Sequence, residues 1–154
     1  MVGVEEVAKW FLSQSSMEHK KLQKLCYYAQ AWHCALEGEP LFSERIEAWV
    51  HGPVIPVLYH KYKNCGWQKI SQVKFDETKL SDSVLEVLNE VLNAVENTYG
   101  GFTGEQLEAL THSEAPWQKA RGDRIKPYEI CTNPINLEDM KEFYLKSYQD
   151  AQND

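Results

Sequence analysis

An apolar stripe between Leu22 and Leu36 limits the folds that this chain can adopt. Its members recur three and four residues apart, which is the period of a helix that buries one face; they are Leu22, Leu25, Cys26, Ala29, Trp32, His33 and Leu36. Gly38 and Pro40 follow, and both residues are typical of a helix end. The stripe therefore predicts a helix of about four turns that begins near Met17.

Further helical patterns occupy most of the remaining chain. We expect helices near residues 4–11, 53–62 and 83–95, then near 103–110, after Ser113 and after Asn136. Ser81 or Ser83, Thr103, Ser113 and Asn136 can each accept hydrogen bonds from the free N–H groups at a helix start. Pro53 can begin another helix, because the first turn has no use for the N–H that proline lacks.

One segment alternates with the two-residue period of a strand. Between Arg45 and Val50, one face carries Ile46, Ala48 and Val50, and the other carries Arg45, Glu47 and Trp49. A single short strand needs a partner, and we expect residues 69–75 to pair with it. The sequence thus predicts a mainly α fold. It is a single compact helical domain over residues 1–154, with about seven helices, a small two- or three-stranded β element and a loose end from about residue 149.

The charge and hydropathy of the chain exclude two classes of partner. Sixteen basic residues against 23 acidic ones give a formal charge of −7, which repels nucleic acid. No apolar run approaches the roughly 20 residues of a membrane-spanning helix. The start, "MVGVEEVAKW", lacks the features of a secretory signal, so we expect a cytoplasmic protein. Its four cysteines form no Cys-x-x-Cys pair and indicate neither disulfides nor zinc.

Two clusters of reactive side chains suggest chemistry, but neither has a suitable spacing. His19, Cys26 and His33 lie seven residues apart, about 10.5 Å along a helix, which is too far for one metal ion. Residues 111–114, "THSE", are neighbours in sequence, whereas a catalytic triad needs side chains from separate parts of a fold. We therefore predict no catalytic residue, no metal site and no cofactor, and we expect that the protein is not an enzyme.

Aromatic residues remain as candidates for an interface. The chain has five tryptophans and eight tyrosines, and such rings are enriched where proteins bind each other. Trp32 lies on the apolar stripe and is expected in the core. Trp49 lies on the strand face opposite Ile46 and Ala48, so it either contributes to a surface or packs beneath a helix. The pattern leaves both possibilities open.

Three stretches together carry a resemblance to a known family. They are "HKKLQKLCYYAQAWHCAL" from His19, "IEAWVHGPVIPVLYHKYK" from Ile46 and "LEALTHSEAPWQKAR" from Leu107. Their order and content resemble the signature blocks of the Panacea domain, a SocA-like or GepA-like phage-associated family. The resemblance implies a small, mainly helical antitoxin that binds a toxin protein directly. In the best-known branch of this family, the antitoxin delivers its toxin to the ClpXP protease.

The resemblance also implies a partner-binding surface. Matched position by position, its residues are Lys24, Tyr27 and Gln30 in the first block, Trp49, Gly52, Pro53, Pro56 and Tyr59 in the second, and Thr111, His112, Trp117 and Arg121 in the third. A strand ending at Gly52 and a helix beginning at Pro53 would hold Trp49 and Tyr59 around a rigid corner. A rigid surface loses less conformational entropy when a partner binds to it.

The function implied is that of an antitoxin in a bacterium or a phage-infected host cell. Its partner would be a cognate protein toxin encoded beside it, neutralised by direct binding. Two alternatives remain open at this point. One is an adaptor that delivers a toxin or a host protein to a ClpXP-type protease, and the other is a phage counter-defence protein that inhibits a host machine.

Overall fold

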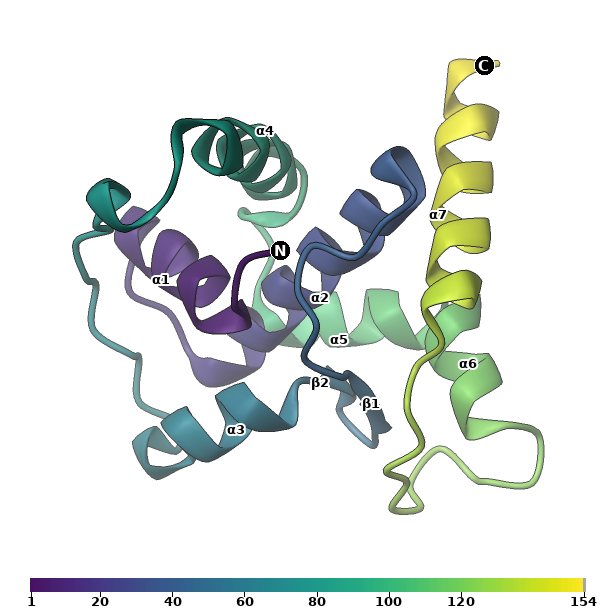
Figure 1. Ribbon diagram of the computed structural model, residues 1–154. Coiled ribbons are helices and arrows are strands. Elements are labelled where there is room, and N and C mark those ends of the chain that lie inside the picture. The colour runs from purple at the N-terminus through teal and green to yellow at the C-terminus, as the bar shows by residue number, and fades with distance from the viewer. Residues whose placement is uncertain (154) are drawn as a thin grey trace.

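The computed structural model describes residues 1–153 of the chain. It contains seven α-helices and one two-stranded antiparallel sheet (Figure 1). The helices are α1 Val4–Gln14, α2 His19–Glu37, α3 Pro56–Tyr62, α4 Asp82–Tyr99, α5 Gly104–His112, α6 Ala115–Arg121 and α7 Leu137–Gln152. The strands are β1 Glu47–Trp49 and β2 Gly52–Val54, and two short 3-10 helices cover Lys63–Cys65 and Glu77–Lys79. The predicted mainly α fold with about seven helices is confirmed for these residues.

Helix α2 lies at the centre of the molecule, with α1 and α4 on one side and α7 on the other (Figure 1). It begins within two residues of the predicted start and ends at Gly38, which has a φ of 80°. Thirteen of its 19 residues are buried, more than the single stripe in the sequence implies. The reason is that five other helices pack around it. One continuous hydrophobic core extends from Val2 to Tyr144.

The predicted partner of the strand was wrong. β1 pairs with β2, in the register Glu47 to Val54, Ala48 to Pro53 and Trp49 to Gly52. Residues 69–75 form no named strand, and Ile70 makes only an isolated bridge to Met17. The chain reverses through the two residues 50 and 51, so pairing within this hairpin closes a far shorter loop than pairing with a distant segment.

Two predicted helix starts were also wrong. Pro53 lies in β2, and the helix expected there begins at Pro56 as α3. Ser113 ends α5 instead of starting α6, whose first turn follows Glu114 and contains Pro116. In both cases a proline fits into the first turn of the helix. The helix begins later than predicted because the chain first changes direction over a few more residues.

Two of the predicted helix caps, Thr103 and Asn136, are confirmed, and of the two serines predicted for α4 it is Ser81 that caps the helix. The side chain of Ser81 accepts from the N–H of Val84, and Thr103 with Gln106 forms a full capping box. Asn136 caps α7. This last helix continues to Gln152, so residues 149–152 are helical and exposed, and the looseness expected from about residue 149 stays a prediction. Asp154 lies outside the described residues.

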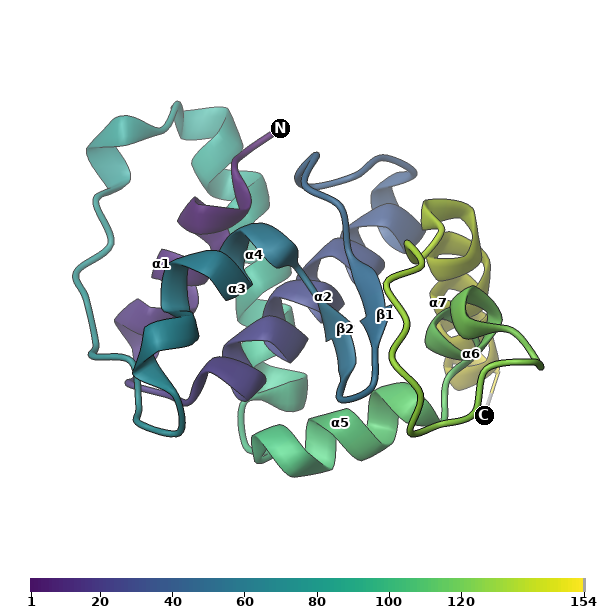
Figure 2. The same ribbon diagram turned by 90° about the horizontal axis from the view of Figure 1, so that it is seen from below.

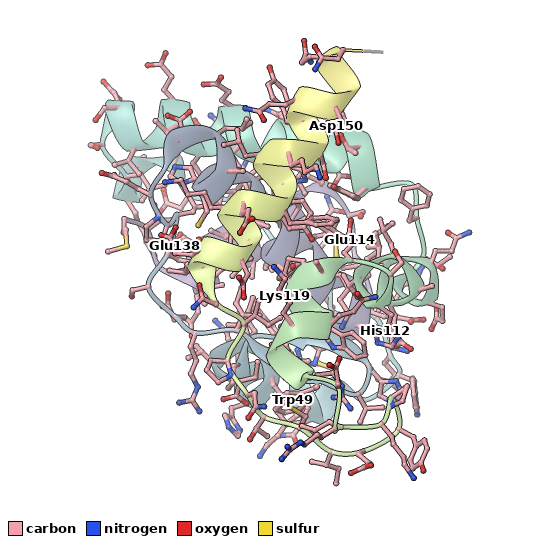
Figure 3. All side chains as sticks on the ribbon, turned by 90° about the vertical axis from the view of Figure 1, so that its right-hand side faces the viewer. Trp49, His112, Glu114, Lys119, Glu138 and Asp150 are labelled. Carbon is pink, nitrogen blue, oxygen red and sulfur yellow. The ribbon has the colours of Figure 1, made fainter. Side chains whose placement is uncertain are left out.

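Glu114 connects three helices and so fixes where α6 lies. Its Oε1 accepts hydrogen bonds from the hydroxyl groups of Tyr28 on α2 at 2.7 Å and of Tyr144 on α7 at 2.8 Å. Burial raises the pKa of this carboxyl group. Figure 3 shows Glu114 at the start of α6, beside α7, with Trp49 below the far end of α6. The same helix carries Trp117 and Arg121 toward the hairpin.

Within residues 1–153, no helix combines the length and the apolar character that crossing a bilayer requires.

Candidate functional site

The hairpin formed by β1 and β2, with the residues that lead into α3, makes a corner at one edge of the molecule. We refer to residues 47–56 as the corner. Seen from below, α5 lies across its tip and the segment between α6 and α7 lies beside β1 (Figure 2). That segment bonds to β1, because the Ala48 N–H donates to the Asn133 carbonyl at 2.9 Å. The sheet itself has only two strands, so other contacts must hold the corner in place.

Arg121 and Trp117 hold the β1 side of the corner. Arg121 is buried, and its Nη1 donates to the Ala48 carbonyl at 2.9 Å, while its Nη2 donates to the carbonyl of Lys126 at 2.8 Å. The Trp117 Nε1 donates to the Trp49 carbonyl at 2.8 Å. The guanidinium group also lies 4.9 Å from the Trp117 ring, within cation–π range. A buried cation is thus satisfied by backbone carbonyl groups and one ring.

Gln23 and Lys24, on α2, hold the β2 side. The Ile55 N–H donates to Gln23 Oε1 at 2.7 Å, and Gln23 Nε2 donates back to the Ile55 carbonyl at 3.2 Å. Lys24 Nζ donates to the Pro53 carbonyl at 3.3 Å. Both side chains are buried, so each supplies a partner to a backbone group that water cannot reach.

Gly52 allows the close approach on which this arrangement depends. Its φ is 103°, a value that residues with a side chain rarely adopt. A Cβ atom at this position would lie 2.7 Å from Lys24 Cε and 2.9 Å from Thr111 Oγ1. Lys24 and Thr111 are both buried, so neither can move aside into solvent. Only glycine fits between α2, α5 and β2 here.

Burial lowers the pKa of Lys24 from 10.5 to about 7, and the nearby carboxylate of Glu108 opposes this only in part. Between these two pH values the unfolded chain binds more protons than the folded chain. The free energy of unfolding therefore rises with pH, by up to about 1.4 kcal/mol per pH unit for this group. The rise is confined to the range between pH 7 and 10.5, because only there does folding release a proton from Lys24.

We expect Lys24→Met to remove this slope. Denaturant unfolding curves at several pH values between 7 and 8 measure it, a range that lies below the ordinary pKa of thiol and phenol groups. Lys79→Met, at an exposed position, is the control and should retain the wild-type slope. Equal slopes for wild type and Lys24→Met would contradict the lowered pKa.

Most of the residues implied by the resemblance are buried and support the fold. Lys24, Gly52, Pro53, Thr111, Trp117 and Arg121 hold or fill the corner, as described above. Tyr27 and Gln30 are buried farther along α2: the Tyr27 hydroxyl lies 3.0 Å from that of Tyr144, and Gln30 Nε2 donates to the Phe42 carbonyl at 2.7 Å. Burial leaves these eight side chains little surface for a partner.

The other four predicted residues have accessible surface. His112 is partly buried, its ring stacks on Trp117 with 4.0 Å between centroids, and burial lowers its pKa. Pro56 is partly buried at the start of α3. Trp49 and Tyr59 lie against each other, edge to face, with centroids 4.9 Å apart. The tyrosine ring is 36% exposed, which places this pair at the surface.

Trp49 and Tyr59 continue into a longer set of rings. Tyr59 stacks on His19 at 5.9 Å, and His19 meets Tyr62 edge to face at 5.8 Å. We call these four residues, Trp49, Tyr59, His19 and Tyr62, the aromatic row. Sequence reasoning did not assign His19 to it. The three-residue spacing of Tyr59 and Tyr62 on one helix was the available signal, but His19 comes from the start of α2 and meets them only in the fold.

His19 is neutral at physiological pH, which leaves the aromatic row without formal charge. Because the Ile55 N–H fixes Gln23 Oε1 as an acceptor, Gln23 Nε2 is the donor toward His19 Nε2, 3.0 Å away. That ring nitrogen is then an acceptor, as in a neutral imidazole. Burial, with a smaller contribution from the charge of Lys24, lowers the pKa of His19 to about 4.

Glu47 orients the first ring of the row. It was predicted on the outer face of the strand, but it is buried. Its Oε1 accepts from Trp49 Nε1 at 2.8 Å, and its Oε2 pairs with Arg45 at 2.6 Å. The Trp49 ring is therefore fixed through both its N–H and its contact with Tyr59.

Within the described part of the chain, no three His, Cys, Asp or Glu side chains lie close enough to hold a metal ion, and the four cysteines are free. The hydroxyl groups of Thr111 and Ser113 donate to carbonyl groups of their own helix, at 2.8 Å and 2.6 Å. The site presents to solvent a row of uncharged rings, with the Lys61 ammonium 5.6 Å from the centroid of the Tyr62 ring.

Residues 22–118 match the family model described as "Antitoxin SocA-like, Panacea domain". The chain belongs to this family. The matched region of this Panacea domain includes the corner and most of the aromatic row, whereas α7 lies beyond it. The resemblance predicted from three sequence blocks is thereby confirmed.

A curated protein is also similar to this chain. Antitoxin SocA from Caulobacter vibrioides (strain NA1000 / CB15N) is 33% identical over 104 residues, which is 62% of this chain and 55% of the relative. The chain thus spans about half the length of the curated relative that it matches. No solved structure matches it significantly.

Proposed function

We propose that this protein is an antitoxin that neutralises a cognate protein toxin by direct binding, and that the aromatic row contacts the toxin. Membership of the Panacea domain family and the name of the relative, antitoxin SocA, support the general role. The aromatic row is the observation that supports where the toxin is proposed to bind. It is a partly exposed, uncharged set of rings on a corner held by buried side chains.

The physical reason is that rigid rings bind at low entropic cost. Aromatic side chains are enriched among the residues that dominate binding energy. Trp49 is already fixed by Glu47 and Tyr59, and the backbone beneath it is held by Arg121 and Trp117. Little freedom would therefore be lost when a partner packs on this surface.

Charge supports a basic partner. The formal charge of −7 would speed the encounter with a positively charged toxin and disfavour acidic ones. The contact itself would be made by the neutral rings. Binding should therefore weaken only moderately as salt increases, because screening acts on the encounter more than on buried aromatic contacts.

Co-expression with the protein encoded by the adjacent gene tests the proposal. We expect the neighbour to arrest growth alone and growth to recover when this protein is present. Recovery should persist in a host that lacks its ClpXP-type protease, because binding alone blocks the toxin. A harmless neighbour, or one that stays lethal, would contradict the antitoxin role for this pair. Recovery that requires the protease would contradict neutralisation by binding alone and favour delivery to the protease.

A further inference from the structure

A second surface lies at the opposite end of α2, where α4 and α7 flank it without closing over it (Figure 1). A pocket of about 320 Å³ opens there, which we call the α4–α7 groove. Its apolar lining comes from three helices: Trp32 and Leu36 on α2, Val91, Ala94 and Tyr99 on α4, and Tyr148 on α7. Leu36 and Tyr148 are 51% and 43% exposed, so the apolar surface is open to solvent.

The floor of the groove is rigid, and its polar atoms already have partners. Trp32 Nε1 donates to the Tyr99 hydroxyl at 2.7 Å, and the Tyr99 ring stacks on Tyr28 with centroids 4.0 Å apart. These groups need no hydrogen bond from an occupant. The floor therefore offers aromatic surface without free polar groups, which favours apolar side chains.

The charges of the groove are of one sign. Its charged lining residues are Glu37, at the end of α2, and Glu90 on α4, and both are exposed. Neither forms an ion pair with any described residue. Lys141 approaches Gly38 nearby but does not line the groove. A second copy of this chain that docked through the same groove would place glutamate against glutamate, so the charges favour a cationic occupant instead.

We propose that the α4–α7 groove binds an amphipathic helix of a partner protein, with apolar side chains inserted between α4 and α7 and with lysine or arginine residues at its flanks. The wall from Glu90 to Thr98 is about 12 Å long, which matches about two turns of such a helix. Its basic residues pair with Glu37 and Glu90. This is the helix-in-groove mode of recognition.

The groove is separate from the aromatic row. His19 and Leu36 lie 17 residues apart, about 25 Å along the axis of α2. One wall, α7, also lies outside the residues 22–118 that match the Panacea domain. The proposal for the groove therefore does not depend on the proposed antitoxin function.

A labelled peptide of about four helical turns tests this inference, since isolated helices much shorter than this are marginal in water. The probe carries leucines on one face and lysines on the flanks, and a matched peptide carries glutamates in place of the lysines. We expect the lysine peptide to bind at physiological salt and to shift the NMR signal of the Trp32 indole N–H, identified with Trp32→Phe. We expect Glu37→Lys/Glu90→Lys to weaken binding at least tenfold.

Two further variants distinguish binding in the groove from a general effect of the protein's net charge. Glu86→Lys/Glu142→Lys changes the net charge by the same amount at exposed positions outside the groove, and it should weaken binding less than threefold. Ala94→Trp should fill the groove and weaken binding as strongly as the Glu37/Glu90 change. Should Ala94→Trp fail to fold, the Glu37/Glu90 comparison still decides, because both positions are exposed.

Four outcomes would overturn the proposal. They are no binding of the lysine peptide, equal binding of the glutamate peptide, an equal loss in both charge variants, and an unchanged Trp32 indole signal at saturation. Sedimentation of the wild type gives an independent check. A dimer that Ala94→Trp separates would show that a second copy fills the groove, and the proposal would be wrong.

Discussion

Gly52→Ala is expected to lower the free energy of unfolding by about 3 kcal/mol, among the largest effects of any single substitution in this chain. Two costs combine. The φ of 103° is unfavourable for any residue with a Cβ atom, and the new methyl group would overlap Lys24 Cε at 2.7 Å and Thr111 Oγ1 at 2.9 Å. Denaturant unfolding monitored by circular dichroism measures the loss.

Substitutions at two other glycines allow the cost of the backbone conformation to be measured apart from the cost of the close packing. Gly66 has a φ of 57° and a ψ of −125°, and no atom lies within 4 Å of the place that an alanine methyl group would take, so Gly66→Ala should cost about 2 kcal/mol, from the backbone alone. Gly101 has neither a positive φ nor a close neighbour, and Gly101→Ala should be nearly neutral. If Gly52→Ala cost no more than Gly66→Ala, the close packing of the corner against Lys24 and Thr111 would be contradicted.

Trp49→Ala/Tyr59→Ala is expected to weaken toxin binding at least 100-fold and to abolish the recovery of growth on co-expression. Each ring, if it lies at the centre of the interface, contributes at least about 2 kcal/mol, and about 1.4 kcal/mol corresponds to a factor of ten in affinity. The rings contact each other at 4.9 Å, so their effects will not be additive, and the double variant is the cleaner test.

A matched pair controls for the loss of aromatic surface. Trp67 and Phe102 are 84% and 42% exposed and lie outside the aromatic row, so Trp67→Ala/Phe102→Ala removes two rings elsewhere on the surface. This control should retain wild-type affinity and rescue. Thermal unfolding of both double variants shows whether the fold is intact, which separates a lost contact from a lost structure.

Local signals in the sequence were enough to predict much of the fold. The caps at Thr103 and Asn136 depend on atoms within three residues and were placed correctly, and the cap of α4 was narrowed to Ser81 or Ser83, of which Ser81 is the one observed. The pairing of β1 with β2 was missed because Pro53 was assigned to the start of a helix, whereas it lies in β2. Proline fits the first turn of a helix and also an edge strand, so the local pattern does not decide between them.

The candidate site was predicted only in part, because the roles of its residues depend on distant partners. Lys24 and Arg121 look like surface residues in the sequence, yet both are buried against carbonyl groups of the corner. Arg121 donates to Ala48, 73 residues away in the chain. The meeting of Trp49 and Tyr59 was anticipated as a corner, whereas His19 joins them only through the packing of α2 on α3. That these residues bind a partner stays a prediction.

The most direct test of the central claim is the dissociation constant between this protein and the purified product of the adjacent gene. It is measured by calorimetry for wild type, for Trp49→Ala/Tyr59→Ala and for the Trp67/Phe102 control. We predict tight binding for wild type and the control, and a dissociation constant at least 100-fold higher for the Trp49/Tyr59 variant. A folded Trp49/Tyr59 variant that binds as tightly as wild type would contradict the assignment of the aromatic row as the toxin-binding surface.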